Sequence, residues 1–531
     1  MSSFSVSAVP KTLVGLLVVA VVSGFAMVMP ATAQAPAPPG PKVTINGLID
    51  QLGTYTSNMS HYDQDYGRAA DKQVYGRTRG RFDVVGEVGR AKAVLGIEID
   101  AYWGQTGSSD TGVAQGSGVG GRQGFGATGG WDINTDTIGQ IELKWLYTEF
   151  PMFLVPATVV RLGAQPFGTA ATYKLAAYAN GDFPGVNWVT QFGPAAALNL
   201  TYVQVEERLT GKDFSSGAWT AAGTASPNRG EDWAVIGSFD FTPFKGLDIK
   251  PMYSYFQAAG VTAGPYGPRQ GKGGIANATT AFDTGDIEAR HTIGVDARWT
   301  AGPFSVAPTV LYQFGSRDTT IGTSRAEADI SAWLADVRVS FQVGPLALGL
   351  MGAYSTGNKA SDNIRSKINY YQPLDTDSSY GGDWGTQILS LGIDYFNQIH
   401  YTVPGLSPGI AISYDRYGRM QLGAKASYAM TPALTVGGAV TSAWTAEKVD
   451  TDSTFSAATG LTPSAEAKGD DRYLGTELDL STTYRFAPGL TFDVVGAYLF
   501  AGDALGYTST RAFSKDPKDV ITATARVRFA F

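Results

Sequence analysis

Three arginines at alternate positions are the feature that most limits how this chain can fold. The stretch YGRTRGRFDVVGEVG, residues 75–89, carries Arg77, Arg79 and Arg81, and Asp83 continues the same parity. A period of two belongs to a β-strand, in which alternate side chains point to opposite faces, so the three guanidinium groups share one face. The other face is mostly apolar. The pattern predicts a strand with one cationic and one apolar face, and leaves open which face meets water.

The N-terminus holds the longest apolar run of the chain. Lys11 is followed by TLVGLLVVAVVSGFAMVMP and then by the small residues of Ala31-Thr32-Ala33. This order predicts a signal peptide over residues 1–33, cleaved after Ala33, and a proline-rich lead-in over 34–42. A single membrane anchor is the alternative, but about 17 apolar residues is at the lower limit for a span. The rest of the chain has no such run, so an exported chain is either soluble or enters a membrane as strands.

The next stretch, AKAVLGIEIDAYW, repeats the rhythm with the opposite charge. Its odd positions are all apolar, whereas its even positions include Glu98 and Asp100. If Gly89-Arg90 is a two-residue turn, Arg81 faces Glu98 and Arg79 faces Asp100. Each such cross-strand pair contributes between a few tenths and about 1 kcal/mol, so the agreement supports the predicted register.

Hairpins of this kind recur along the whole body of the chain. Tight turns are predicted at 242–246, 301–303, 344–345 and 487–489, and long polar segments at 104–137, 207–230, 258–287 and 447–471. Short turns at one end and long loops at the other are typical of a transmembrane β-barrel. A propeller or tandem sandwich is disfavoured because no fixed repeat of suitable length is present.

The predicted fold is therefore all-β: a single transmembrane antiparallel barrel over residues 43–531, with short periplasmic turns and long external loops. About 18 strands are expected, within a range of 16–20. The count is 18 if 356–417 is one long external excursion, and 20 if WGTQILSLGIDYF and GIAISYD are both strands. An arginine on the lipid face at mid-depth would cost roughly 2–4 kcal/mol, so the arginines are expected to face a water-filled lumen.

The end of the chain, VITATARVRFAF, alternates apolar residues with polar ones and stops at Phe531. It resembles the C-terminal strand of Gram-negative outer-membrane proteins, which the assembly machinery reads. Closure of the barrel would pair this strand with the first, VTINGLIDQLGTYT, because a closed barrel has no free edge. Arg526 and Arg528 would then share a wall with the three arginines of the second strand.

The signal peptide, arginine wall, terminal phenylalanine and glycine-rich alternating body together resemble the porin family of outer-membrane channels, over about residues 43–531. The resemblance implies an outer-membrane location, contact with lipid and lipopolysaccharide, a homotrimer, and a third external loop that folds into the barrel as a constriction. Here that loop is 166–185, PFGTAATYKLAAYANGDFPG, whose charged residues are Lys174 and Asp182.

Other chemistry finds little support. Cysteine is absent, which excludes thiolate metal sites and a lipidated cysteine, and the net charge of −7 without a basic block gives no footprint for nucleic acid. The three histidines lack the His-x-Ser context of a barrel phospholipase, so no enzyme is predicted. No cofactor is predicted. DINTD resembles a calcium loop, but Thr137 and Leu143 replace the required glycine and glutamate, so no metal site is predicted either.

The sequence thus predicts a porin for passive diffusion of small hydrophilic solutes and ions, weakly anion-preferring. Few inward aromatic residues are expected (Tyr102, Phe256 and Tyr473), which disfavours an oligosaccharide channel. The alternatives are a structural or surface-interaction barrel with a plugged lumen, or a substrate-specific channel. The predicted pore-lining residues are Arg77, Arg79, Arg81, Glu98, Asp100, Lys174, Asp182, Arg526 and Arg528.

Overall fold

The structure is a computed structural model of the chain. It describes residues 40–58, 72–103, 130–131, 140–155, 157–167, 177–179, 181–206, 229–260, 287–321, 324–362, 367–374, 384–390, 392–393, 417–449, 469–505, 507–508, 514–515 and 517–531. The predicted signal peptide, residues 34–39 of the lead-in, and the acidic residues of DINTD lie outside these ranges. Within them, no helix is long and apolar enough to cross a membrane.

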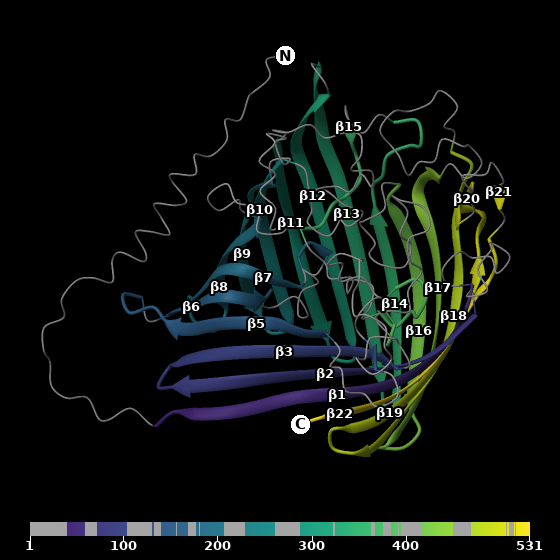
Figure 1. The fold of residues 1–531 in the computed structure, drawn as a ribbon, viewed down its shortest axis with the longest axis horizontal. Coiled ribbons are helices and arrows are strands. Elements are labelled where there is room, and N and C mark those ends of the chain that lie inside the picture. Colours follow the sequence, from purple (N-terminus) through teal and green to yellow (C-terminus); the bar gives the residue numbers. More distant parts are fainter. Residues whose placement is uncertain are drawn as a thin grey trace, which may run out of the picture.

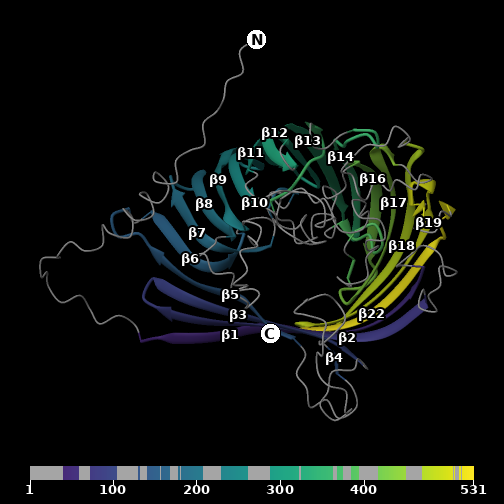
Figure 2. The ribbon, with the colours of Figure 1, turned by 45° about the horizontal axis from the view of Figure 1, so that its top comes forward.

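Among the described residues, eighteen antiparallel strands form one closed barrel. Figures 1 and 2 show this barrel from two directions. The first half comprises β1 (Lys42–Ser57), β2 (Lys72–Val88), β3 (Ala91–Trp103), β5 (Gln140–Pro151), β6 (Thr158–Pro166), β7 (Asp182–Gln191), β8 (Ala196–Glu206), β9 (Arg229–Phe244) and β10 (Leu247–Gly260). The second half comprises β11 (Ile287–Ala301), β12 (Phe304–Ile321), β13 (Ser324–Val343), β14 (Leu346–Ser355), β16 (Arg419–Ala429), β17 (Leu434–Val449), β18 (Asp471–Ala487), β19 (Leu490–Ala501) and β22 (Val520–Ala530). Four two-residue strands accompany them: β4 (Gly130–Trp131), β15 (Lys367–Ile368), β20 (Tyr507–Thr508) and β21 (Ser514–Lys515).

The barrel closes where β1 lies between β2 and β22, beside the C-terminus in Figure 2. Leu52 of β1 pairs with Arg77 on one side and with Arg526 on the other. Gly47 and Phe531 exchange two backbone hydrogen bonds of 2.9 Å, which extends the seam to the last residue. The predicted pairing of the first and last strands is confirmed.

β14 and β16 are neighbours in the wall. β14 pairs directly with β16 over ten residues, from Leu346–Tyr428 to Ser355–Arg419, which leaves no place for another strand. Residues 384–390 of WGTQILSLGIDYF lie inside the barrel instead, and GIAISYD lies outside the described residues. The lower of the two predicted strand counts, 18, is therefore correct.

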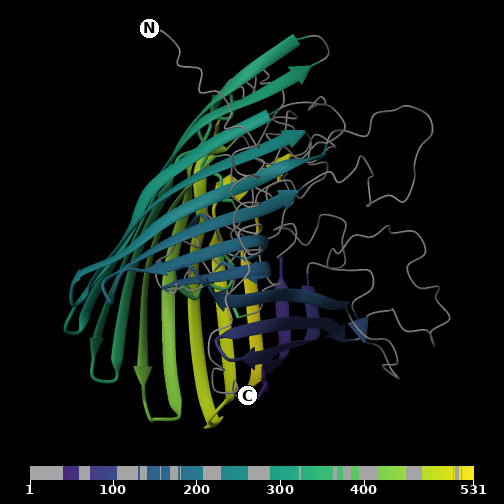
Figure 3. The same ribbon diagram turned by 90° about the vertical axis from the view of Figure 1, so that its left-hand side faces the viewer.

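Tight turns gather at one end of the barrel, as Figure 3 shows for the teal, green and yellow strands. Two-residue turns join β2 to β3, β9 to β10, β11 to β12, β13 to β14 and β18 to β19. Gly89 and Gly344 have φ of 60° and 53°, a conformation that glycine adopts without steric cost. The other end has the long connections, except that Ile321 of β12 pairs with Ser324 of β13 across a tight hairpin.

The two faces of the wall differ as the alternation predicts. Exposed apolar side chains cover the outside, such as Leu350 at 57%, Leu422 at 61% and Leu480 at 75% exposure. Charged and polar side chains of the opposite parity point inward, for example Asp50 and Lys250, which are almost fully buried. This arrangement is that of a membrane barrel, because lipid meets the apolar face and the polar groups satisfy one another inside.

Segments from the long connections occupy part of the interior. Residues 177–179, together with Tyr371 and Leu374, pack with strand residues such as Phe256 and Leu334 in one buried cluster. Residues 388–389 pack with Leu474 and Leu499 in a second cluster. The lumen therefore contains apolar cores of its own, which alternation along the strands does not predict.

Candidate functional site: the charged wall and the inserted segments

The predicted register of β2 and β3 is confirmed. Arg81 pairs with Glu98 and Arg79 with Asp100 across the two strands. The Arg79 guanidinium donates to both Asp100 carboxylate oxygens, at 2.8 and 2.7 Å, and Arg77 donates to the same carboxylate at 3.1 Å. Arg81 donates to Glu98. The bidentate Arg79–Asp100 pair fixes the orientation of both side chains.

The same charge alternation continues around the barrel through the closing seam. Arg528 of β22 donates to both oxygens of Asp50 on β1, at 2.6 and 2.7 Å, and Asp50 is the register partner of Arg79. Arg526 donates twice to Asp493 of β19, at 3.1 and 2.8 Å. The five arginines therefore share one wall, and each has an acidic partner. Asp493 was missed by the sequence because its pairing depends on the register of the last hairpin.

The five arginine side chains differ in how much of their surface is exposed to the lumen. The side chains of Arg81 and Arg528 are 32% and 31% exposed, whereas Arg77, Arg79 and Arg526 are 10% exposed or less. Pairing and burial reduce the field of the inner three, since a neighbouring carboxylate cancels most of a charge at a distance. The cationic character open to solutes rests mainly on Arg81 and Arg528.

A bulge in β5 adds a further cation that the sequence did not reveal. The β3–β5 register shifts between Gly96 and Ile97, so Lys144 and Trp145 point to the same side. Lys144 Nζ lies 3.2 Å from Asp182 and 3.7 Å from Glu98, and Trp145 Nε1 donates to Asp182 at 2.5 Å. Asp182, a predicted site residue, is thus joined to the charged wall. Lys174 lies outside the described residues.

The third external connection, between β6 and β7, reaches the lumen side of β10. Tyr178 is fully buried, and its hydroxyl donates to Ser254 Oγ of β10 at 2.7 Å. The Leu374 N–H donates to the Tyr178 carbonyl at 2.7 Å, and the Tyr371 hydroxyl donates to the Ala177 carbonyl at 3.0 Å. Burial raises the pKa of both tyrosine hydroxyls, that of Tyr371 well above its ordinary value, so both remain neutral donors.

Residues 370–374 are bound to β12 by the amide side chain of Gln313, which makes the two hydrogen bonds that the backbone of a neighbouring strand would make. Gln313 accepts from the Gln372 N–H at 2.8 Å and donates to the Gln372 carbonyl at 2.6 Å. The Gln372 side chain accepts from Arg290 Nη1 at 2.9 Å. Arg290 is fully buried, lies 3.2 Å from Glu288 and stacks 4.8 Å over the Phe256 ring. This cluster joins two inserted segments to the wall.

A third inserted segment, residues 384–390, lies against β16, β17 and β18. Trp384 donates from Nε1 to Thr441 Oγ1 at 3.1 Å, and its carbonyl accepts from Lys425 Nζ at 2.9 Å. The same ammonium group lies 4.3 Å from the centre of the Trp384 ring, a cation–π contact. Tyr178, Tyr371 and Trp384 are interior aromatic residues that come from connections, so the alternation of the strands gave no sign of them.

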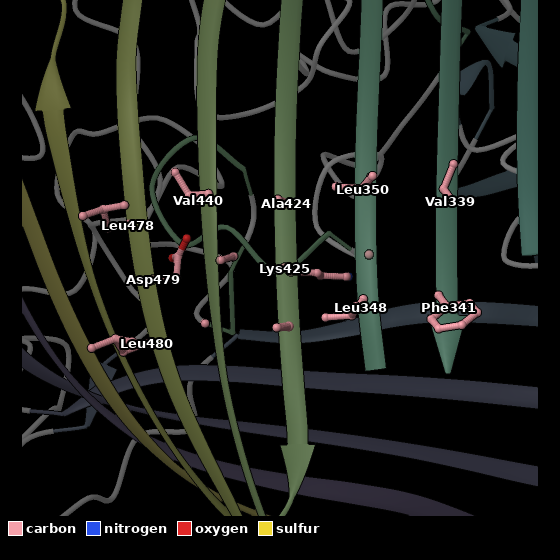
Figure 4. A pocket seen from close by; sticks show the side chains of 14 residues that line it. Val339, Phe341, Leu348, Leu350, Ala424, Lys425, Val440, Leu478, Asp479 and Leu480 are labelled. Carbon is pink, nitrogen blue, oxygen red and sulfur yellow. The ribbon is translucent and has the colours of Figure 1, made fainter. Parts of the chain in front are cut away.

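Two hollows lie on opposite sides of the wall in this sector. On the lumen side, a cavity of about 500 Å³ is lined by Arg338, Trp384, Lys425, Asp479 and Ser481, among others. On the outer side, small residues of β16 and β17 leave an apolar groove of about 730 Å³ between the leucines of β14 and β18. Figure 4 shows Leu348 and Leu350 on one side of this groove and Leu478 and Leu480 on the other.

One histidine and no cluster of metal-ligating side chains lie in the part of the chain that the structure describes. His291 is the histidine found there, on the outer face, where Nδ1 lies 2.8 Å from the Tyr253 hydroxyl and the ring stacks on Phe314. No group of three or more metal-ligating side chains occurs among the described residues.

The closed barrel, its apolar outer belt and its charged interior define the class of fold: a transmembrane antiparallel β-barrel.

No family model and no curated protein matches the chain. Similar solved structures include Pseudomonas aeruginosa OccK8 (OprE), with 12% identity and a TM-score of 0.47, and P. aeruginosa OccK9 (OpdG), with 10% and 0.48. Acinetobacter baumannii OccAB4 has 11% identity and a TM-score of 0.45. Each comparison covers 92% of this chain and 98% of the other. The likeness is distant.

Proposed function

We propose that the chain is a narrowed diffusion channel for small hydrophilic solutes and ions across the outer membrane. The observation that carries this proposal is the contrast between the two sides of the lumen. One side, on β22, β1, β2, β3 and β5, presents paired charges, of which Arg81 and Arg528 remain about a third exposed. Inserted segments 177–179, 370–374 and 384–390 pack mainly against strands β7 to β19, and the cluster that contains 388–389 also includes Val520 at the start of β22.

In this proposal the connection 166–185 contributes to the constriction, together with the connection between β14 and β16. Solutes pass beside the charged wall, where polar groups replace part of their hydration. The pore-lining role is assigned to Arg77, Arg79, Arg81, Glu98, Asp100, Lys174, Asp182, Arg526 and Arg528. A plugged barrel is the alternative, and the two apolar clusters inside the lumen favour it; the exposure of Arg81 and Arg528 favours an open path.

The ion selectivity that we infer is weak. If Asp50, Asp83, Glu98 and Asp100 were the only acids near the five arginines, the wall would keep a positive excess. The structure adds Asp493 as a partner of Arg526, which removes much of that excess. A slight anion preference at low salt is expected, carried by the more exposed arginines and reduced as salt shortens the Debye length to about 3 Å at 1 M.

Planar bilayers test the proposal. Purified protein should produce discrete conductance steps, and liposomes containing it should swell in small sugars but not in large ones. A slightly anion-selective reversal potential is expected in a potassium chloride gradient. Folded protein that produces no conductance steps would favour the plugged barrel. The homotrimer implied by the porin resemblance remains a prediction, which native mass spectrometry of detergent-extracted protein would check.

A further inference from the structure

Residues 384–390 form a compact turn whose shape is fixed from within. Gly385 has φ of 99°, and Gly392, just beyond the turn, has φ of 61°. The Gln387 side chain donates to the Gly385 carbonyl at 2.7 Å, and the Ser390 hydroxyl donates to the Thr386 carbonyl at 3.1 Å. The turn can therefore keep its conformation while its contacts to the wall change.

Three successive backbone N–H groups of this turn point at one carboxylate. Gln387 and Ile388 donate to Glu477 Oε1 at 2.7 and 2.8 Å, and Leu389 donates to Oε2 at 2.7 Å. Successive N–H groups form a concavity that binds anions, and bonds to a charged acceptor are about twice as strong as neutral ones. Glu477 is fully buried beneath the turn on the lumen side of β18.

We propose that Glu477 is the positioning residue that holds the segment 384–390 in the lumen, as a latch separate from the anchor of 370–374. Apart from the bond between Gln387 and Asp479, the other polar contacts of the segment to the wall that the structure describes are those of Trp384 with Lys425 and Thr441, at its beginning. Ile388 and Leu389 add apolar packing with Leu474 and Leu499, which has no directional bond to hold the turn in place. Loss of the Glu477 bonds frees the part that narrows the lumen while the barrel wall stays intact. The conductance consequence rests on the proposed function; the latch itself does not.

The neighbouring carboxylate provides a matched control. Asp479 lies on the same face of β18 and accepts one longer bond, from the Gln387 N–H at 3.2 Å. Asp479→Asn and Glu477→Gln make the same chemical change, from a carboxyl group to an amide, at two neighbouring positions on one face of β18. Glu477→Gln also turns one acceptor into an NH₂ group that faces N–H donors, whereas Asp479→Asn leaves the three short bonds in place.

Cysteine accessibility tests the latch without reference to transport. The chain has no cysteine, so single cysteines can be placed at Ile388, which is fully buried in this segment, and at Leu374, 3% exposed in the other anchored segment. Each is combined with Glu477→Gln, with Asp479→Asn or with no second change. Labelling by a water-soluble thiol reagent is then followed on folded barrels, which are identified by their heat-modifiable migration on gels.

The expected result is that Ile388→Cys labels about tenfold faster or more with Glu477→Gln, because local opening exposes it, while Leu374→Cys stays protected. Asp479→Asn should leave both slow. Unchanged labelling of Ile388→Cys with Glu477→Gln would overturn the proposal, as would equal acceleration by Asp479→Asn or parallel exposure of Leu374→Cys. If Glu477→Gln does not fold, Gln387→Pro removes one backbone donor to Glu477 and leaves β18 intact, and Gln387→Ala is its control for loss of the side chain that bonds to the Gly385 carbonyl. Larger single-channel conductance for the released variant is expected only if the proposed function also holds.

Discussion

Leu480 and Ser481 offer a direct test of which face of the wall meets lipid, because they are consecutive on β18. Leu480 is 75% exposed on the outside, and its register partners are Gly438 and Gly496, which give it no side-chain cover. Ser481 lines the cavity on the lumen side. We predict that Leu480→Arg is strongly destabilising and that Ser481→Arg is tolerated.

The loss of folding free energy expected for Leu480→Arg depends on how deep residue 480 lies in the membrane. Leu480 precedes the end of β18 at Ala487 by seven residues, which is about 23 Å along the strand and roughly 18 Å along the membrane normal for a strand tilted by about 40°. That depth lies within an apolar band of about 25 Å, where an arginine costs roughly 2–4 kcal/mol. The unfolding equilibrium should therefore change by about 30-fold to 900-fold.

Reversible urea unfolding in lipid vesicles, followed by tryptophan fluorescence, measures this difference. Leu480→Ala is the control for loss of the leucine itself and separates that loss from the cost of the charge. Ser481→Arg should unfold within about 1 kcal/mol of the parent, because its guanidinium reaches water or the cavity. Equal destabilisation by the two arginine substitutions would show that the assignment of faces in this sector is wrong.

Three further predictions concern the charged wall and the seam. Replacing Arg77, Arg79 and Arg81 together by alanine leaves carboxylates without partners, so the reversal potential should shift toward cations and conductance should rise slightly; unchanged selectivity would mean that these arginines act only as structural partners. Glu98→Arg should destabilise the barrel by about 3–5 kcal/mol although it faces the lumen, because it removes the partner of buried cations, and urea unfolding close to that of the parent would refute this. Phe531→Ser should lower the yield of closed barrel, since its ring packs 6.2 Å from Phe82 and 5.7 Å from Phe529, and heat-modifiable migration in normal amounts would contradict it.

The strands and their register could be predicted because charge and alternation agree along them. Arg81 and Glu98 face each other in any hairpin that has its turn at Gly89-Arg90. A shift of the register by one residue would turn the charged side chains of one strand toward lipid. The bulge at Lys144 and Trp145 could not be predicted in this way. A bulge changes which residues share a face, and it is visible only when the partner strand is known.

The segments inside the barrel could not be predicted from the sequence, for a different reason. WGTQILSLGIDYF alternates well enough for a strand, so its pattern does not separate a wall position from an interior one. The direct pairing of β14 with β16 decides the matter. Glu477 is equally ambiguous, because a lumen carboxylate can be satisfied by water or by backbone N–H groups. Here it takes three N–H groups from a segment about 90 residues earlier in the chain.

The small residues beneath the outer groove leave the middle of β17 with little to fix its own alignment. Gly437, Gly438 and Ala439 carry no large group on either face, so these three positions do not favour one register over another. The adjoining strands are different: a shift by one position would carry Lys425 of β16 or Asp479 of β18 from the lumen side into hydrocarbon, at roughly 2–4 kcal/mol for the lysine and less for the aspartate. Those two side chains therefore help to align the middle of the strand that lies between them.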